Sequence, residues 1–248
     1  MSAASELAVV VLTGAGISAD SGVATFRGAG GLWEGQRIED VATPRAWRRD
    51  PELVWRFYQL RRAALVGVVP NAAHHALVEL ERRLAGAGGS FLLVTQNVDD
   101  LHERAGSRNL LHMHGELAAL RCERCGVRVR DLEHVDPEEF VACEACAHAR
   151  LRPDVVWFGE TPYHADTVER ALEHCTHFLA VGTSGVVYPA AGFLELARER
   201  GAQTLVQALE RPENAHRGDV FVPGRAAEVL PVLLAEWASE RSLPEADR

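Results

Sequence analysis

The chain has 248 residues, of which 47% are hydrophobic and 25% are charged, which suits one large domain or one domain with a sizeable insert. Its formal net charge of −9 argues against a general affinity for nucleic acid or anionic membranes, which requires a cationic surface. All 26 basic residues are arginine, so the chain offers no lysine side chain for acylation.

The first apolar run is preceded by no basic segment and is too short to cross a bilayer. No other segment approaches the length required. We therefore expect a cytoplasmic protein with no membrane segment.

Predicted strands and helices alternate from this run onward. Residues 8–16 are β-branched and end in glycines, typical of a buried parallel strand entering a phosphate-binding loop. Helices are predicted over residues 43–67, where Asp50 and Pro51 suit an N-cap and first helical position, and over 71–89, with Asn71 as N-cap. Residues 90–100 read as a strand, and 109–117 as a short strand and turn.

The second half resumes the alternation after an interruption. Residues 118–150 are charged, contain four cysteines and lack long apolar runs. Strands are then predicted over 154–160, at the start of 176–200 and over 203–209. Helices are predicted over 164–175, at the end of 176–200 and over 226–240, and the last eight residues are expected to be frayed.

This order indicates an α/β fold: a Rossmann-like parallel sheet with helices on both faces, plus a smaller zinc-binding and helical subdomain. We expect a single domain over 1–248. Its Rossmann-like part would comprise residues 1–33, 86–117 and 151–240, and its small part residues 34–85 and 118–150.

The cysteines predict a metal site. Two CxxC pairs at this separation suit tetrahedral zinc–thiolate coordination by Cys122, Cys125, Cys143 and Cys146. Because sulfur fills all four positions, a single zinc would be structural rather than catalytic. Cys175, at the end of a predicted helix, is expected to be a buried small hydrophobic residue rather than a nucleophile.

The first strand is followed by a possible cofactor loop. Gly14, Gly16 and Ala19 match G-x-G-x-x-[GA], in which glycines let the backbone approach a pyrophosphate and a helix N-terminus supplies N–H donors. Such a glycine turn also occurs without a ligand. Glu39 or Asp40 is spaced to bind a ribose, although the residues between do not resemble a short crossover.

Two other predicted strands end in polar residues, one in Gln96, Asn97 and Asp99 and the other in Gly182, Thr183 and Ser184. Open parallel sheets bind ligands at this edge, although each group also fits an ordinary helix cap. His112 and His114 share one face of an extended segment. A histidine before a glycine at a strand end can serve as a general base, and two ordinary polar histidines are the alternative.

Together these segments resemble the sirtuins, the family of NAD-dependent protein lysine deacylases. GAGISADSGVATFRG (14–28), TQNVDDLHERAG (95–106), HMHGEL (112–117), the paired CxxC and GTSGVVYPAA (182–191) stand in the family's order and spacing. The resemblance extends from residue 8 to 237. It implies NAD as co-substrate, one structural zinc, acyl-lysine proteins or peptides as partners, and release of nicotinamide and O-acyl-ADP-ribose. We expect a monomer.

The resemblance also assigns roles to residues. His114 would be the catalytic base, because it directly precedes Gly115. The implied NAD contacts are Gly14, Ala15, Gly16 and Ser18 near the phosphates, Phe26 and Arg27 in a closing loop, Gln96, Asn97 and Asp99 near the nicotinamide ribose, and Gly182, Thr183, Ser184 and Ala226 at the adenosine end. Residues 155–159, with Val156, Phe158 and Gly159, and 185–188 would hold the peptide as an added strand.

One departure concerns the adenosine ribose. The family often places an asparagine in an N-L-E stretch, whereas this chain reads Gln207-Ala208-Leu209-Glu210. The amide is therefore missing or shifted to Gln207, which puts that contact in doubt.

Tyr58 and Arg61 resemble the Y-x-x-R element of class III sirtuins, the desuccinylase and demalonylase branch, and Ala42 the small residue that leaves room for a longer acyl chain. Arg61 would offer its planar fork to a distal carboxylate and Tyr58 a hydroxyl. We therefore expect succinyl- and malonyl-lysine to be preferred over acetyl-lysine, with some deacetylation. In a random helix, the same pair would be an ordinary surface pair.

Several alternatives stay open. The chain would act mainly as a deacetylase if the pair lay on the surface, or as a protein mono-ADP-ribosyltransferase using the same NAD site. A non-catalytic binding module is disfavoured by the acidic charge and by the His114 segment. In a conventional dehydrogenase the QNVD and HG segments would have no role.

Overall fold

The structure is a computed structural model that describes residues 7–24, 32–33 and 35–240. The predicted cofactor-closing residues Phe26 and Arg27, and the last eight residues, lie outside this description.

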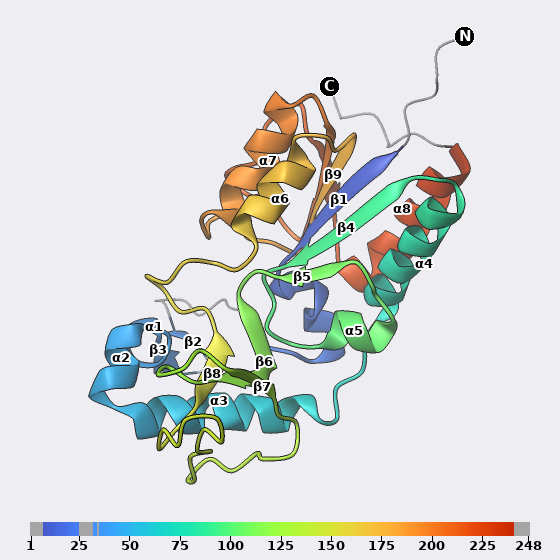
Figure 1. Cartoon of the computed structure of the whole chain (residues 1–248). Coiled ribbons are helices and arrows are strands. Elements are labelled where there is room, and N and C mark those ends of the chain that lie inside the picture. The colour runs from blue at the N-terminus through green and yellow to red at the C-terminus, as the bar shows by residue number, and fades with distance from the viewer. Residues whose placement is uncertain (1–6, 25–31, 34, 241–248) are drawn as a thin grey trace.

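A six-stranded parallel sheet forms the centre of the larger part (Figure 1). Its strands are β1 (Ala8–Thr13), β4 (Ser90–Thr95), β5 (Leu110–His112), β9 (His177–Val181), β10 (Gln203–Ala208) and β11 (Val220–Pro223). Their spatial order is β11-β10-β9-β1-β4-β5, and every neighbouring pair is parallel. The chain builds outward from β1 to β5 and then continues on the other side of β1 with β9, so the winding direction reverses between β1 and β9.

Both faces of this sheet are buried, as alternation along β1 shows. Val9 and Val11 pack beneath α4 (Ala72–Gly86) and α8 (Ala226–Glu240). Val10 and Leu12 face α6 (Ala165–Leu172) and α7 (Ala190–Glu199) on the opposite side. A strand covered on both faces needs apolar residues at every position, which explains the continuous apolar run. The predicted α/β class with helices on both faces is confirmed.

The smaller part contains an antiparallel sheet of β6 (Gly115–Arg121), β7 (Arg128–Arg130) and β8 (Arg152–Val155), in the order β7-β6-β8. Packed with it are α1 (Ile38–Val41), α2 (Pro44–Arg49) and α3 (Pro51–Leu65), and a short β2 (Leu32–Trp33)–β3 (Gln36–Arg37) hairpin precedes them. Its core gathers large aromatic side chains, among them Trp47, Trp55, Tyr58 and Trp157.

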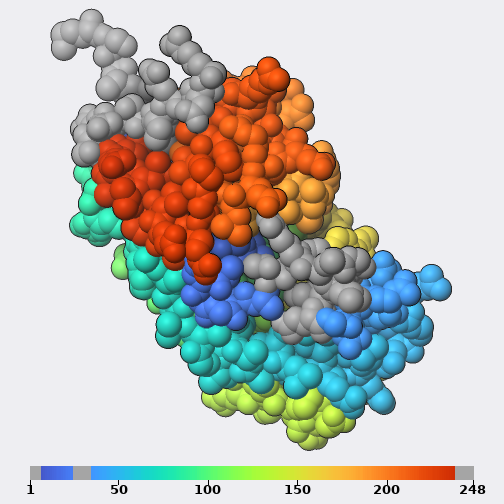
Figure 2. Space-filling view, turned by 180° about the vertical axis from the view of Figure 1, so that it is seen from behind, coloured from blue at the N-terminus to red at the C-terminus, as the bar shows by residue number. Residues whose placement is uncertain are grey.

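Short elements complete the chain: α5 (Leu101–Ala105) and the 3-10 turns η1 (Ala15–Ile17) and η2 (Ala19–Ser21). The 3-10 turns stand where the glycine motif predicted a helix N-terminus, so a long helix dipole is not available there. Seen from behind, the blue residues after β1 reach the surface beside the red helix α8 and the cyan helices α3 and α4 (Figure 2).

The predicted helix over 43–67 divides at Asp50, whose carboxylate caps α3 by accepting from the Leu53 N–H at 3.0 Å. Asn71 caps α4 in the same way, accepting from the Ala73 N–H at 2.9 Å. Both caps are confirmed, since each side chain meets an N–H that a helix start leaves without a partner.

Two boundaries differ from prediction. The strand expected over 154–160 ends at Val155, because Gly159 takes a φ of +90° and the Glu160 side chain accepts from the Trp157 N–H at 2.9 Å, which turns the chain. Helix α4, placed by the sequence in the small part, packs on the large sheet through Leu77, Leu80 and Leu84.

Candidate active site

A cavity of about 580 Å³ opens at the carboxyl ends of β1 and β9 and extends to the smaller part. This is the point where the winding direction reverses, at which open parallel sheets bind ligands. Most of the described residues that the sequence predicted for cofactor, catalysis or substrate line it: Gly14, Ala15, Gly16, Ser18, Ala42, Tyr58, Arg61, Gln96, Asn97, Asp99, His114, Val156, Phe158, Gly159, Gly182, Thr183, Ser184 and Ala226. Glu39 and Asp40 lie on α1 and do not line it.

The two glycine loops meet at the floor of the cavity. The Gly14 N–H donates to the Val181 carbonyl at 2.9 Å, and the Gly16 N–H donates to the Gly182 carbonyl at 2.8 Å. A Cβ on Gly16 would lie 2.7 Å from the Gly182 Cα. These glycines therefore permit loop–loop packing, and the N–H groups of Gly14 and Gly16 are engaged with backbone carbonyls.

Asn97 ties the loop after β4 to the loop after β1. Its side-chain nitrogen donates to the Gly14 carbonyl at 3.2 Å and to Ser18 Oγ at 3.1 Å, and Ser18 Oγ donates to Asp99 at 3.0 Å. Burial raises the pKa of Asp99, although hydrogen bonds from Leu101 and Ser18 oppose that effect. The network fixes three polar side chains on one wall of the cavity.

His114 is held on the same wall. Its Nδ1 lies 3.0 Å from the Gln96 carbonyl, and a carbonyl oxygen only accepts. Nδ1 therefore carries the hydrogen, and Nε2 of the neutral ring keeps its lone pair. Burial lowers the pKa of His114, while the hydrogen bond to Gln96 opposes this. A neutral imidazole with a lone pair at Nε2 can accept a proton near pH 7.

Gly115 brings the histidine segment against β8. Its φ is +77°, and a Cβ there would lie 2.0 Å from the Asp154 carbonyl oxygen. Only glycine satisfies both conditions. The H-G pair thus has a structural reason that does not depend on catalysis.

His112 occupies a different environment. Its Nδ1 lies 3.1 Å from the Asn97 carbonyl and its Nε2 lies 2.6 Å from Glu103. Burial lowers the pKa of His112, but the hydrogen bond and charge of Glu103 outweigh it and the net shift is upward. With both nitrogens facing acceptors, His112 is not placed to accept a proton.

At the small-domain end of the cavity, Tyr58 is fully buried and Arg61 is 7% exposed. The Arg61 guanidinium donates to the Phe57 carbonyl at 2.7 Å and lies 3.2 Å from the centre of the Phe57 ring. Trp157 Nε1 donates to the Tyr58 oxygen at 3.0 Å. The pair is therefore buried in the cavity wall and is not a surface pair.

The adenosine end predicted by the resemblance contains Gln207. This buried side chain donates to the Gly224 carbonyl at 2.7 Å, which ties β10 to the turn before α8. Ala208, where the family's asparagine would stand, also lines the cavity. Arg225 pairs with Asp20 across its rim, a contact that no sequence motif indicated.

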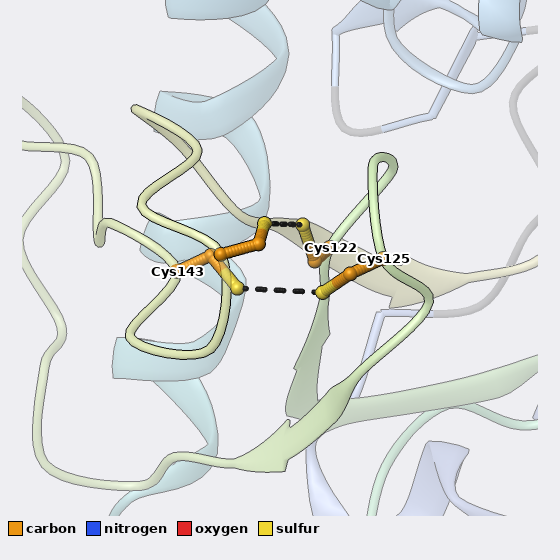
Figure 3. Close-up of side chains that lie close together, drawn as sticks. Cys122, Cys125 and Cys143 are labelled. Carbon is orange, nitrogen blue, oxygen red and sulfur yellow. Dashed lines mark hydrogen bonds between the residues drawn. The ribbon is translucent and has the colours of Figure 1, made fainter.

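The four cysteines fit one zinc ion. Figure 3 shows the labelled Cys122, Cys125 and Cys143 with their sulfur atoms turned toward one another. The Cys122–Cys146 and Cys125–Cys143 sulfur distances are 3.6 and 3.7 Å, and all four sulfur atoms lie within 4.8 Å of one another. Tetrahedral zinc with bonds of 2.3 Å separates its sulfurs by about 3.8 Å. Cys175 is buried, with its sulfur 3.5 Å from the Leu172 carbonyl, as expected for a packed residue.

Across the ranges that the structure describes, no helix combines the length and apolar character needed to cross a membrane.

Known proteins match most of the chain. The sequence profile of the Sir2 family matches residues 14–189. An NAD-dependent protein deacylase of Pasteurella multocida is 48% identical over 94% of this chain and 98% of its own length. One of Caulobacter vibrioides is 50% identical over 90% of this chain and 93% of its own.

Solved structures agree with the sequence matches. A Sir2 homologue in complex with NAD superimposes with a TM-score of 0.86 at 39% identity, covering 94% of this chain and 90% of that one. Sir2Af2 bound to a myristoylated histone peptide gives a TM-score of 0.71 at 31% identity, covering 94% and 92%.

Proposed function

Since the chain belongs to the Sir2 family, we propose that it is an NAD-dependent protein lysine deacylase that prefers succinyl- and malonyl-lysine over acetyl-lysine. The deacylase activity is supported by similar proteins named for it and by a Sir2 homologue that binds NAD. The acyl preference is supported by the arginine and tyrosine at the small-domain end of the cavity.

The burial of Arg61 is the observation that carries the acyl preference. Arg61 is 7% exposed and lines the cavity beside Tyr58, so its guanidinium is placed to donate to an anionic group of a ligand that enters there. A distal carboxylate would receive donors from both Arg61 and Tyr58, whereas an acetyl group cannot reach them. Removing one partner of a buried hydrogen-bonded charge pair costs about 2–5 kcal/mol.

The remaining residues act around the co-substrate. NAD, when bound, supplies the ribose carbon that takes the acyl oxygen as nicotinamide departs. His114 Nε2 would accept the proton of a ribose hydroxyl, since its Nδ1 is already committed to Gln96. Gln96, Asn97 and Asp99 would orient the ribose and exclude water from it.

The substrate peptide would lie beyond the end of β8. The backbone of residues 156–159 leaves the β6–β8 ladder there, and exposed apolar side chains flank it, namely Phe158, Val186 and Tyr188. An extended peptide would pair with the carbonyl groups of this segment, because the N–H groups of Val156, Trp157 and Phe158 already donate within the protein. Pairing through the backbone favours recognition of the acyl-lysine over the flanking sequence.

Steady-state kinetics on one peptide would test this proposal, with lysine carrying an acetyl, malonyl, succinyl or glutaryl group, with and without NAD. We expect NAD-dependent turnover and a higher kcat/KM for the acidic groups. Arg61→Met should lower kcat/KM for succinyl-lysine by at least about 30-fold. Arg56→Met is the matched control, because Arg56 is on the same helix but pairs with Glu138 at the surface.

The possible outcomes separate the alternatives. Equal loss in both variants, or turnover of acetyl-lysine alone, would contradict the acyl preference. Labelled NAD whose label stays on the acceptor protein would favour mono-ADP-ribosyl transfer instead. Because the chain contains no lysine, acyl-lysine signals come only from the added substrate.

A further inference from the structure

Trp157 lines the cavity near Tyr58 and Arg61, at what we call the acyl end, and no role of its own within the 155–159 segment was predicted for it from the sequence. Its side chain is 2% exposed, and its Nε1 lies 3.0 Å from the Tyr58 oxygen. An indole N–H can only donate, so the Tyr58 oxygen must be the acceptor. The hydrogen of the Tyr58 hydroxyl therefore points to a group other than Trp157.

This contact constrains the direction in which Tyr58 donates. The hydrogen of a phenol lies near the ring plane and has two positions, one on each side of the C–O bond. A donor that occupies one side leaves the other for the hydrogen. Burial raises the pKa of Tyr58, so the hydroxyl keeps its proton at neutral pH and acts as a donor.

Trp157 is itself held rigidly. The Arg152 guanidinium lies 3.3 Å from the centre of its ring, and Arg152 donates to Glu160 at 2.7 and 3.0 Å. Glu160 also accepts from the Trp157 backbone N–H at 2.9 Å, so one carboxylate fixes both the backbone and the stacking partner. Trp47 packs nearby, with ring centres 5.8 Å apart.

We propose that Trp157 is a positioning residue for acyl specificity, which directs the Tyr58 hydroxyl toward the distal carboxylate of an acidic acyl-lysine. This inference rests on the proposed acidic-acyl preference and assigns one of its causes to a residue outside the Tyr58–Arg61 pair. A donor whose orientation is restricted before the ligand binds loses less rotational freedom on binding.

The contribution of Trp157 should appear in the ratio of kcat/KM for succinyl-lysine to kcat/KM for acetyl-lysine. An acetyl group does not extend to the Tyr58 hydroxyl, so its turnover does not use the oriented donor. The ratio is measured on a single preparation, which cancels the fraction of active enzyme. A merely structural role for Trp157 would lower both activities and leave the ratio unchanged.

A double-mutant cycle tests the inference with Trp157→Phe, Tyr58→Phe and the double variant. Trp157→Phe removes the N–H but keeps an aromatic ring, and should lower the ratio by about three- to tenfold. In the Tyr58→Phe background the same substitution should change the ratio by less than about twofold, because no hydroxyl remains to be directed. Benzothienylalanine at position 157 replaces the N–H by sulfur with the same ring shape, and serves if the phenylalanine variant is unstable.

The outcomes distinguish this inference from the function on which it rests. If the wild-type enzyme shows no succinyl preference, the proposed acyl specificity is wrong and the role of Trp157 falls with it. If Tyr58→Phe lowers the ratio but Trp157→Phe does not, the acyl specificity stands and the role of Trp157 is overturned. Equal effects of Trp157→Phe with and without Tyr58 would overturn it as well.

Discussion

At the scale of single residues, the state of His114 follows from one backbone contact. The Gln96 carbonyl fixes the hydrogen on Nδ1, and Nε2 is left as the basic nitrogen. Burial lowers the pKa of the ring below its ordinary value of 6.5, so the neutral form predominates at pH 7. The sequence identified this residue through its neighbour Gly115, but it contained no signal for the partner at Gln96.

The pH dependence of kcat/KM should reflect this state. The active form is the unprotonated ring, so the rate should stay level around neutral pH and decline as pH falls through a pKa below 6.5. Initial rates between pH 5 and 8 would measure the midpoint, with circular dichroism at each pH to verify folding. A decline centred above 6.5 would contradict the assignment, and His114→Ala should abolish the reaction.

A second residue-scale prediction concerns the missing adenosine-ribose amide. Ala208 is buried and lines the cavity, whereas the Gln207 amide is engaged with Gly224. Ala208→Asn should add a hydrogen bond to the ribose, worth about 1 kcal/mol, and lower KM for NAD about fivefold. Ala208→Leu has a similar branched shape without the amide and should not lower KM. Equal KM values for the two variants would show that the ribose is not bound there.

At the scale of elements, two buried histidines join α4 to α5. His74 Nδ1 accepts from the Asn71 N–H at 3.2 Å, and His102 Nε2 lies 3.0 Å from Thr13 Oγ1, which donates to Thr95. The two ring centres are 4.9 Å apart. A ring nitrogen that accepts from a backbone N–H must be unprotonated, so the cap of α4 requires neutral His74.

These contacts should make the fold sensitive to mild acid. Burial, then the nearby His75, lowers the pKa of His74 to about 4, and burial, then the neighbouring His74 and His112, lowers that of His102 to about 3. Below pH 6.5 the unfolded chain binds protons at both positions that the folded chain does not. The free energy of unfolding should therefore fall as pH decreases from 6.5 toward these values, by roughly 1.4 kcal/mol per pH unit for each histidine.

Urea unfolding at pH 7.5, 6.5, 5.75 and 5 would measure this slope. His74→Asn places an amide oxygen near the position of Nδ1 and should remove the part of the slope that belongs to His74, while His102, His114 and His177, whose pKa values are also lowered, keep theirs. His75→Asn is the control, because its side chain is exposed on the same helix. The slope is taken between pH 5.75 and 5, where His112, whose pKa is raised, stays protonated in the folded chain and is mostly protonated in the unfolded chain. If the unfolding free energy of the wild-type protein did not change with pH in this range, His74 and His102 would not both be neutral in the folded state.

Sequence signals located the elements that carry their own start and stop residues. Asp50 and Asn71 were recognisable as caps because each acts within three residues of its position. The short β11 was not predicted, since its four residues are defined by pairing with β10 rather than by a pattern of their own. The end of β8 was also missed, because a continuous apolar run conceals the turn that Glu160 stabilises.

At the scale of the whole molecule, the cavity lies where the sheet's winding reverses and the small part meets it. The cavity side of the sheet was predicted from the polar residues at the strand ends, whereas the order of the strands was not predicted. The packing of the two glycine loops, the Asp20–Arg225 pair and the Trp157–Tyr58 contact could not, because each joins segments far apart in the chain. Such contacts depend on tertiary geometry that a single sequence does not express.

The zinc site is linked to the cavity through the hydrophobic core of the smaller part. Cys122 and Cys143 are each 2% exposed and belong to the same core as Trp47, Trp55 and Trp157. Binding of a structural zinc ion contributes directly to folding, and its loss would leave the thiols without the bonds that hold them together beside this core. Loss of zinc should therefore disturb Trp157 and, through it, the acyl end of the cavity. The two hydrophobic clusters on the faces of the large sheet should remain intact.

Removal of the metal by a strong chelator should therefore lower Tm and abolish succinyl-lysine turnover together, and metal analysis should find one zinc per chain beforehand. Zinc should restore both quantities, whereas magnesium should not, because thiolates prefer the softer ion. Cys143→Ser should reproduce the loss, and Cys175→Ser should keep its zinc, since that thiol packs against Leu172 away from the cluster. Full activity in protein shown to be free of zinc would mean that the cysteine cluster does not support the cavity.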